Sequence, residues 1–401
     1  MQTNRVADKY SPLYFLASVG AGGLSVSFFM YLLFWVPHKG TPVATFNHIA
    51  AYWPNASMSA KGAIALAMTA IAVFAFLNLQ KLAWNISAFN RWKQTDAYQT
   101  LRNSNAETTL LAYPLALAMT VNGLFIVGLV FVPGLWNVVE YLFPVAMFTF
   151  ALIGMFALSI IGDFLGRVLT KGGVFDVTAH NSFAQMLPTF ALAMVSVGFA
   201  APAAMSSVPV TVGFSLVGST FFGTAAVIYA ALALFTAFNS MLHYGTAKEA
   251  APTLMIVVPL MTILGIMSLR QDHGLHATFN AHGAPVETMM FLAKLISVQV
   301  VFLLLGMTVL SRQGYFRQFV LGNDTSPGSY GLICPGVAFS VLLQFFVNKG
   351  LVAAGLVDKF SIAYWAITAI ALASQFLMVW LILRLNKQHF SKVETAAVPA
   401  E

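Results

Sequence analysis

Residues 183–206 read FAQMLPTFALAMVSVGFAAPAAMS and contain no charged side chain. About 20 apolar residues suffice for a helix to cross the hydrocarbon core of a bilayer, so this stretch predicts a membrane-spanning helix. It also holds Pro188, Gly198 and Pro202, which are residues that interrupt or weaken helices. Apolar length and helix breakers inside it both recur along the chain.

The composition of the whole chain agrees with this interpretation. Hydrophobic residues make up 59% of the 401 residues and charged residues 8%, against roughly 45–50% and about 25% in soluble globular proteins. The 20 Lys and Arg and 13 Asp and Glu are too few to cover a soluble surface of this size. The composition therefore excludes a soluble enzyme, a nucleic-acid-binding protein and a disordered scaffold.

Ten stretches are long and apolar enough to span a membrane. They lie at roughly 13–36, 62–84, 108–132, 137–162, 183–206, 209–241, 252–269, 288–311, 329–348 and 361–384. We therefore expect an all-α polytopic membrane protein. Its transmembrane domain would cover 13–386, between an N-terminal segment at 1–12 and a C-terminal tail at 387–401.

Lys and Arg predict the orientation, because cytoplasmic loops are enriched in them. If the N-terminus is cytoplasmic, 14 of the 20 fall on the inner side and Lys294 falls within a span. The outer side holds five, which are Lys39, Lys61, Arg270, Lys349 and Lys359. We attribute the net charge of +7 to basic loops on the cytoplasmic side. We expect a multi-pass protein of the bacterial inner (cell) membrane with both termini cytoplasmic.

The odd-numbered spans all carry helix breakers within the apolar run, whereas the second and tenth carry none in their interior. The breakers are Gly20, Gly22 and Gly23, then Pro114 and Gly123, then Pro188, Gly198 and Pro202, then Pro259 and Gly265, and finally Gly331, Pro335 and Gly336. Such residues can serve ordinary close packing of membrane helices. A proline inside a span also frees a carbonyl, which is tolerated only where protein or a water-filled cavity supplies a partner. Repetition over alternate spans favours five helical hairpins around a central pore, each with an inner, kinked helix.

The odd spans offer hydroxyls and amides along this path but no charged residue or histidine at mid-depth. A coupled carrier usually needs a buried ionisable group, so the pattern favours passive conduction over freed carbonyls, hydroxyls and amides. The residues expected to line the pore are Gly22, Ser25, Pro114, Asn122, Pro188, Thr189, Pro259 and Thr262.

Nothing in the sequence predicts catalysis, a resident metal or a cofactor. His273, His276 and His282 with Asp272 match no closed zinc signature in their spacing. No phosphate-binding glycine loop is present, since the GAGG at 20–23 lies inside an apolar span. The expected partners are anions and the lipid bilayer, and no nucleic acid.

Two local patterns resemble a known family. The stretch APTLMIVVPLMTILGI at 251–266 is similar to the seventh span of the tellurite-resistance/dicarboxylate transporter family, which includes bacterial TehA-type channels and plant slow anion channels. The stretch SYGLICPGVAFS at 329–340 is similar to the ninth span of that family. The resemblance implies ten helices in five hairpins, a homotrimer with one pore per subunit, and substrates such as chloride, nitrate, sulfite and malate.

The chain departs from the family at the residue that plugs the pore. The family has a phenylalanine before the ninth-span proline, and this chain has Cys334 before Pro335. The resemblance therefore implies an open pore or a plug formed by another aromatic residue, with Phe339, Phe199 and Tyr113 as candidates.

The leading hypothesis is an anion channel or facilitator for small inorganic anions or C4-dicarboxylates. A proton-coupled exporter of sulfite or dicarboxylates is the first alternative, with His180 and His243 near inner helix ends as titratable groups. A membrane subunit of a respiratory complex is the second, although the histidines fall in predicted loops or at helix ends, where they do not suit haem ligation.

Overall fold

The computed structural model describes residues 10–171, 175–176, 178, 181–279 and 283–390. All regular secondary structure in these ranges is helical, and ten segments are long and apolar enough to span a membrane. They are Pro12–Trp35, Met58–Trp92, Asn105–Phe131, Leu135–Lys171, Phe183–Met205, Pro209–Tyr244, Lys248–Phe279, Pro285–Arg312, Pro327–Val352 and Ile362–Phe390. Each overlaps one predicted stretch, so the expected all-α polytopic membrane protein is confirmed.

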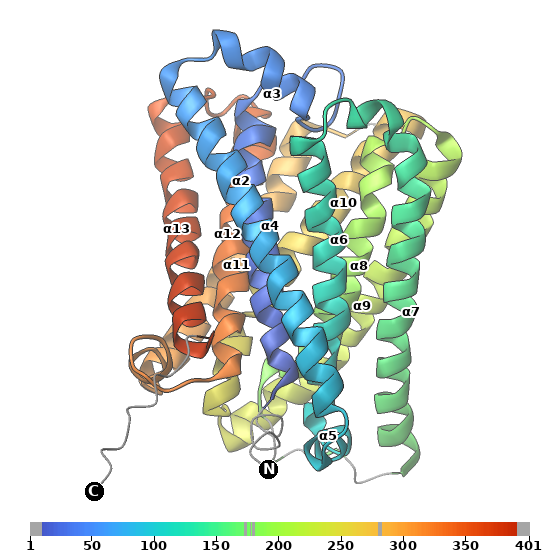
Figure 1. Cartoon of the computed structure of the whole chain (residues 1–401), viewed down its shortest axis with the longest axis vertical. Coiled ribbons are helices and arrows are strands. Elements are labelled where there is room, and N and C mark those ends of the chain that lie inside the picture. The colour runs from blue at the N-terminus through green and yellow to red at the C-terminus, as the bar shows by residue number, and fades with distance from the viewer. Residues whose placement is uncertain (1–9, 172–174, 177, 179–180, 280–282, 391–401) are drawn as a thin grey trace, which may run out of the picture.

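Five helices form a closed inner ring, in which each contacts the next and the last contacts the first. They are α2 (Phe15–Trp35), α6 (Ala112–Phe131), α8 (Leu187–Met205), α10 (Val257–Phe279) and α12 (Ile333–Phe345). Each forms a hairpin with an outer helix, respectively α4 (Met58–Trp92), α7 (Val139–Lys171), α9 (Pro209–Tyr244), α11 (Pro285–Arg312) and α13 (Ile362–Phe390) (Figure 1). In their most apolar windows the inner spans are 56–94% buried and the outer spans 17–33%. The alternation seen in the sequence is therefore an alternation of inner and outer helices.

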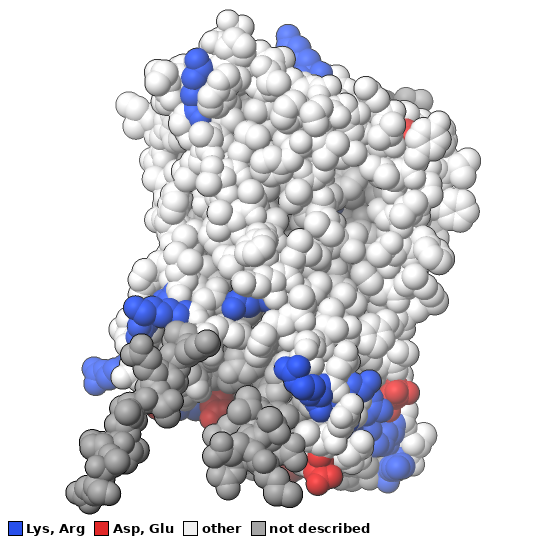
Figure 2. Space-filling model, viewed as in Figure 1, with Lys and Arg blue, Asp and Glu red and all other residues white. Residues whose placement is uncertain are grey.

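Two short helices mark opposite ends of the bundle. Helix α3 (Phe46–Tyr52) lies at one end and α5 (Asp96–Arg102) at the other (Figure 1), and we call these the α3 end and the α5 end. On the face drawn in Figure 2, Lys and Arg gather mainly toward the α5 end, and a broad uncharged surface band separates the two ends. Outer helices expose large apolar side chains, such as Phe76, Phe148 and Phe235. This is the surface that a bilayer requires.

Four inner spans begin in the same way at the α5 end. Each starts as a 3-10 helix, at Asn105–Leu111, Phe183–Met186, Lys248–Met255 or Pro327–Leu332, and then becomes an α-helix. Pro114, Pro188, Pro259 and Pro335 are the second or third residues of those α-helices. The first-turn N–H groups of an α-helix lack intrahelical partners, so proline is tolerated there. These four prolines therefore lie in first turns and not deep within an α-helix as expected, whereas Pro202 does lie inside α8.

Gly154 and Gly162, both on α7, provide a test of the packing of α7 on α9. A Cβ atom on Gly154 would lie 2.3 Å from the ring of Phe222, whereas one on Gly162 would have nothing within 4 Å. Phe222 is itself buried and stacked on Phe199, so its ring cannot retreat.

We expect Gly154→Ala to lower the midpoint of thermal unfolding in detergent, because overpacking costs about 1–3 kcal/mol. Gly162→Ala should leave the midpoint unchanged or raise it slightly, since alanine is favoured over glycine in helices by about 1 kcal/mol. Equal midpoints for the two variants would contradict this packing.

Candidate functional site

A cavity of about 1060 Å³ lies inside the ring and extends to the connecting segments at the α3 end. All five inner helices contribute to its wall. Most of the wall is apolar, with residues such as Val19, Met119, Met194, Ile263 and Val337. The few polar groups on it therefore decide what can bind.

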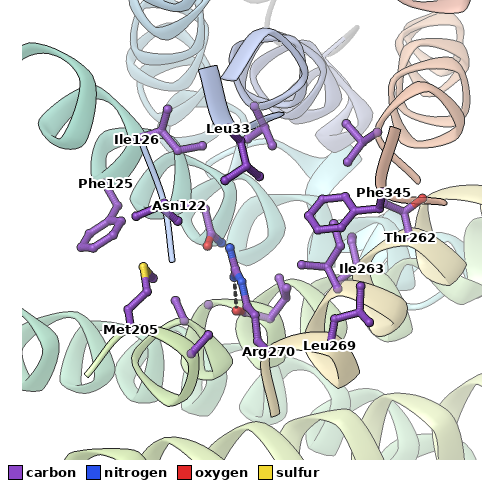
Figure 3. A pocket seen from close by; sticks show the side chains of 18 of the residues that line it. Leu33, Asn122, Phe125, Ile126, Met205, Thr262, Ile263, Leu269, Arg270 and Phe345 are labelled. Atoms are coloured by element: carbon purple, nitrogen blue, oxygen red, sulfur yellow. Dashed lines mark hydrogen bonds between the residues drawn. The ribbon is translucent and has the colours of Figure 1, made fainter. Parts of the chain in front are cut away.

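Arg270 extends into the middle of this cavity from α10, and its guanidinium lies toward Asn122 of α6 (Figure 3). Its Nη1 donates a hydrogen bond to the carbonyl oxygen of Val197 on α8, at 2.7 Å. The side chain is half-buried in the apolar wall. Arg270 is therefore a cation inside the ring, held to a neighbouring inner helix.

Pro202 interrupts the regular bonding of α8 close to Val197. Proline lacks an N–H, so the carbonyl of Gly198, four residues earlier, loses its regular partner in the helix. Beside the interruption, the Ser215 hydroxyl donates to the carbonyl oxygen of Phe199 and accepts from the Ala203 N–H at 2.8 Å. Side chains of α9 and α10 thus bond backbone groups around the proline, as the sequence argument requires of a breaker within a span.

No carboxylate in the described ranges lies within 4 Å of Arg270. The ion pairs in those ranges lie near the α5 end instead, where fully buried Glu107 pairs with Arg102 at 3.1 Å and with Arg167. Arg102 also reaches Asp163 at 3.5 Å, so these pairs tie α5 and the following segment to α7. A charge taken out of water is costly unless it is paired, and no carboxylate in the described ranges pairs with Arg270.

The expectation of inner helices without fixed charge was wrong at this residue. The seventh span was predicted to end at 269, with Arg270 in an outer loop, but α10 continues to Phe279. Hydropathy falls at LRQDHGLH while the helix goes on, because no breaker occurs between Met267 and Gly274. Helical spacing was the available signal, since Thr262, Ile266 and Arg270 recur every four residues and all line the cavity.

Four of the twelve residues predicted for the pore line the cavity, namely Asn122, Pro259, Thr262 and Cys334. The Thr262 hydroxyl donates to the carbonyl of Ala338 at 2.8 Å and accepts from Gln299 at 2.7 Å. It therefore links α10 to α12 and α11 at the cavity wall.

The other eight residues lie outside the cavity wall. Gly22 approaches Met119 and Asn78, and the Ser25 hydroxyl donates to the Ile71 carbonyl of α4 at 3.3 Å. Phe199 stacks on Phe222 between α8 and α9. The remaining five are Pro114, Pro188, Thr189 and Pro335, which are buried, and Phe339, which is partly buried against the core. Tyr113, the third aromatic candidate for a plug, stacks on Phe15 with ring centroids 4.6 Å apart.

A septum closes the cavity toward the α5 end. Beyond it lies a second cavity of only about 20 Å³, and Phe190, Pro259 and Cys334 line both. All three of these residues are buried, and so are Leu16 and Leu187 on the far side. Phe190 is thus the aromatic residue at the septum. The sequence contains 35 phenylalanines, and no pattern singled this one out.

The mouth of the cavity at the α3 end carries charges of both signs. Asp272, His273, His276, Glu287 and Lys349 line it. Within the described ranges no three His, Cys, Asp or Glu side chains are placed to hold a metal ion. His180 and His282 lie outside the described residues.

Fold and cavity together define a multi-pass protein of the membrane transporter or channel class. Comparison of the chain with protein-family models finds no match. Comparison with curated proteins finds no significant match either.

Cys334 is the sole cysteine of the sequence and lies at the septum of the cavity. The rate at which a thiol reagent modifies it therefore measures how readily that reagent reaches the septum. Two methanethiosulfonate reagents, one with an anionic sulfonate and one with a cationic ammonium group, are compared, and each modification rate is divided by that reagent's rate with a free thiol in water. We expect the normalised rate to be higher for the anionic reagent, and the measured quantity is the ratio of the anionic to the cationic rate. The ratio should be roughly tenfold, because Arg270 contributes on the order of 1–2 kcal/mol at a partly screened separation.

Arg270→Gln should bring that ratio close to one. Lys294→Gln, a change at an exposed lysine of α11, serves as the matched control and should leave it unchanged. The same ratio in the wild type and in Arg270→Gln would show that Arg270 does not act on the cavity.

Proposed function

We propose that the chain is a passive channel or facilitator for small anions, either inorganic ions or C4-dicarboxylates. The observation that carries the proposal is Arg270, a guanidinium without a carboxylate partner in the described ranges, on the wall of the central cavity. At 4 Å and an effective dielectric constant of 20, two unit charges interact by about 4 kcal/mol. Such a group attracts an anion and repels a cation.

The surroundings of Arg270 support passage in preference to tight capture. Asn122 offers an amide near the guanidinium, and the remaining wall is mostly apolar. An ion held by one cation and a few amides or hydroxyls binds weakly enough to leave again, which conduction requires. In the closed arrangement of this structure, the septum at Phe190 has to move before an ion can reach the α5 end.

The septum also supports the proposed membership of the tellurite-resistance/dicarboxylate transporter family. Cys334 stands before Pro335, where the family has its plugging phenylalanine, and Cys334 lies at the septum. Phe190 reaches the same place from α8. We infer that this chain carries its plug on a different inner helix.

Ion flux into proteoliposomes tests the proposal with a panel of chloride, nitrate, sulfite and malate. We expect the wild type to pass at least one of them well above protein-free liposomes, and Arg270→Gln to lower that flux about tenfold or more, a loss of about 1.4 kcal/mol per factor of ten. Lys294→Gln should match the wild type. Permeation of potassium instead, or equal anion flux in Arg270→Gln, would exclude the proposal.

Proton-coupled anion export is a second candidate because of the residues at the mouth. Asp272, His273 and His276 line the cavity within two turns of Arg270, and chains of Asp, Glu and His side chains carry protons in many membrane transporters. The same flux panel separates the two functions. Passive conduction predicts anion flux that continues after the pH gradient is collapsed, whereas obligatory coupling predicts that it stops.

Orientation and assembly complete the proposal, with both termini cytoplasmic and the chain a homotrimer. In a Cys334→Ser background, an impermeant maleimide should label Thr41→Cys on intact cells and Asn103→Cys only after permeabilisation. The purified protein should have about three times the chain mass of 43.3 kDa. The reverse labelling pattern would overturn the orientation, and a monomeric mass would overturn the assembly.

A further inference from the structure

The cavity wall is not made of inner helices alone. Leu142, Val145, Ala146 and Thr149 of the outer helix α7 also line it, together with Leu124 of α6. Val145 is 62% exposed and Leu124 47% exposed, so these residues border both the cavity and the outside of the bundle. The cavity therefore has a side arm between α6 and α7, and Figure 2 shows the surface hollowed at this level.

Small residues create the room for this side arm. Ala201, Pro202 and Ala204 of α8 form the facing wall. Phe125 of α6 and Phe143 of α7 also line the cavity, with ring centroids 6.1 Å apart. The arm therefore opens toward the lipid beside this ring contact, where Leu124 and Val145 are exposed.

The side arm and the middle of the cavity differ in chemistry. The side arm is apolar apart from the Thr149 hydroxyl, which already donates to the carbonyl of Val145 at 2.9 Å. Arg270, in the middle of the cavity, carries a charge with no carboxylate beside it in the described ranges. A small inorganic anion would occupy little of the roughly 1060 Å³, and apolar cavities hold water poorly. The shape and polarity match a ligand that has one anionic group and one alkyl chain.

We propose that a fatty acid enters from the bilayer between α6 and α7 and binds with its carboxylate at Arg270 and its chain in the side arm. One guanidinium matches one carboxylate in charge and in bidentate geometry. The bound fatty acid competes with small anions for Arg270. The inference shares Arg270 with the proposed function, but it does not require that the protein conducts ions.

Direct binding tests this without any flux. Purified protein is titrated with radiolabelled oleate in detergent, and with methyl oleate as the uncharged analogue. We expect saturable, one-to-one binding of oleate that Arg270→Gln weakens at least tenfold, and no comparable binding of methyl oleate.

Val145→Trp should also weaken oleate binding at least tenfold, because the indole fills the side arm. Val227→Trp is the matched control on the lipid-facing surface of α9 and should bind as the wild type does. If Val145→Trp does not purify as a folded protein, Ala146→Leu narrows the same arm with a smaller side chain.

Three outcomes would overturn the proposal: no saturable oleate binding, equal affinities in Val145→Trp and Val227→Trp, or displacement of oleate by dioleoylphosphatidylglycerol at equal concentration. The last result would show that the site takes two-chain anionic lipids. Because oleate binding and ion flux are measured separately, a protein that fails to bind oleate can still conduct anions, and one that fails to conduct can still bind oleate.

Discussion

The charge of Arg270, which has no carboxylate beside it in the described part of the chain, is the constraint on which the interpretation of the cavity depends. A guanidinium on an apolar wall is stable only if something balances it, and among the described residues Arg270 donates one hydrogen bond, to the carbonyl oxygen of Val197. That bond crosses from α10 to α8, so it also fixes two helices of the ring. The remaining donors face the cavity, where an anion can complete the pairing.

The rest of the architecture keeps this charge in place and limits access to it. Five inner helices begin at the α5 end with a 3-10 segment, which for four of them leads into an α-helix with a proline in its first turn. This shared start gathers Phe190, Pro259 and Cys334, each on a different inner helix, into one septum. The outer helices shield the ring from lipid, except where the side arm opens between α6 and α7. The septum therefore closes the cavity between Arg270 and the α5 end, and Arg270 can be reached from the mouth at the α3 end and from the side arm.

Apolar length and the spacing of breakers were enough to predict ten spans and the inner position of the odd-numbered ones. Both signals are local, and the bilayer imposes them directly. Asn122, Pro259 and Thr262 could be placed on the cavity wall for the same reason, whereas Cys334 was placed there only through the family resemblance. Ser25 could not, because only the packed structure shows that its hydroxyl bonds α4 rather than facing the pore.

The prediction from sequence failed where hydropathy falls although the helix continues. Arg270 was assigned to a loop because charge ends an apolar window, although nothing there ends a helix. Phe190 was missed because many aromatic residues share its sequence environment, and its place at the septum depends on the rotation of α8 against α10 and α12. Such facts of packing between distant segments are not encoded in any local pattern.

The central claim is that Arg270 makes the cavity selective for anions, and a zero-current potential tests it most directly. The protein is reconstituted into a planar bilayer under a potassium chloride gradient, as the wild type and as Arg270→Glu. The account predicts a potential near the chloride equilibrium value for the wild type and a shift toward the potassium value for the variant. An anion-selective potential that is the same in both would contradict it.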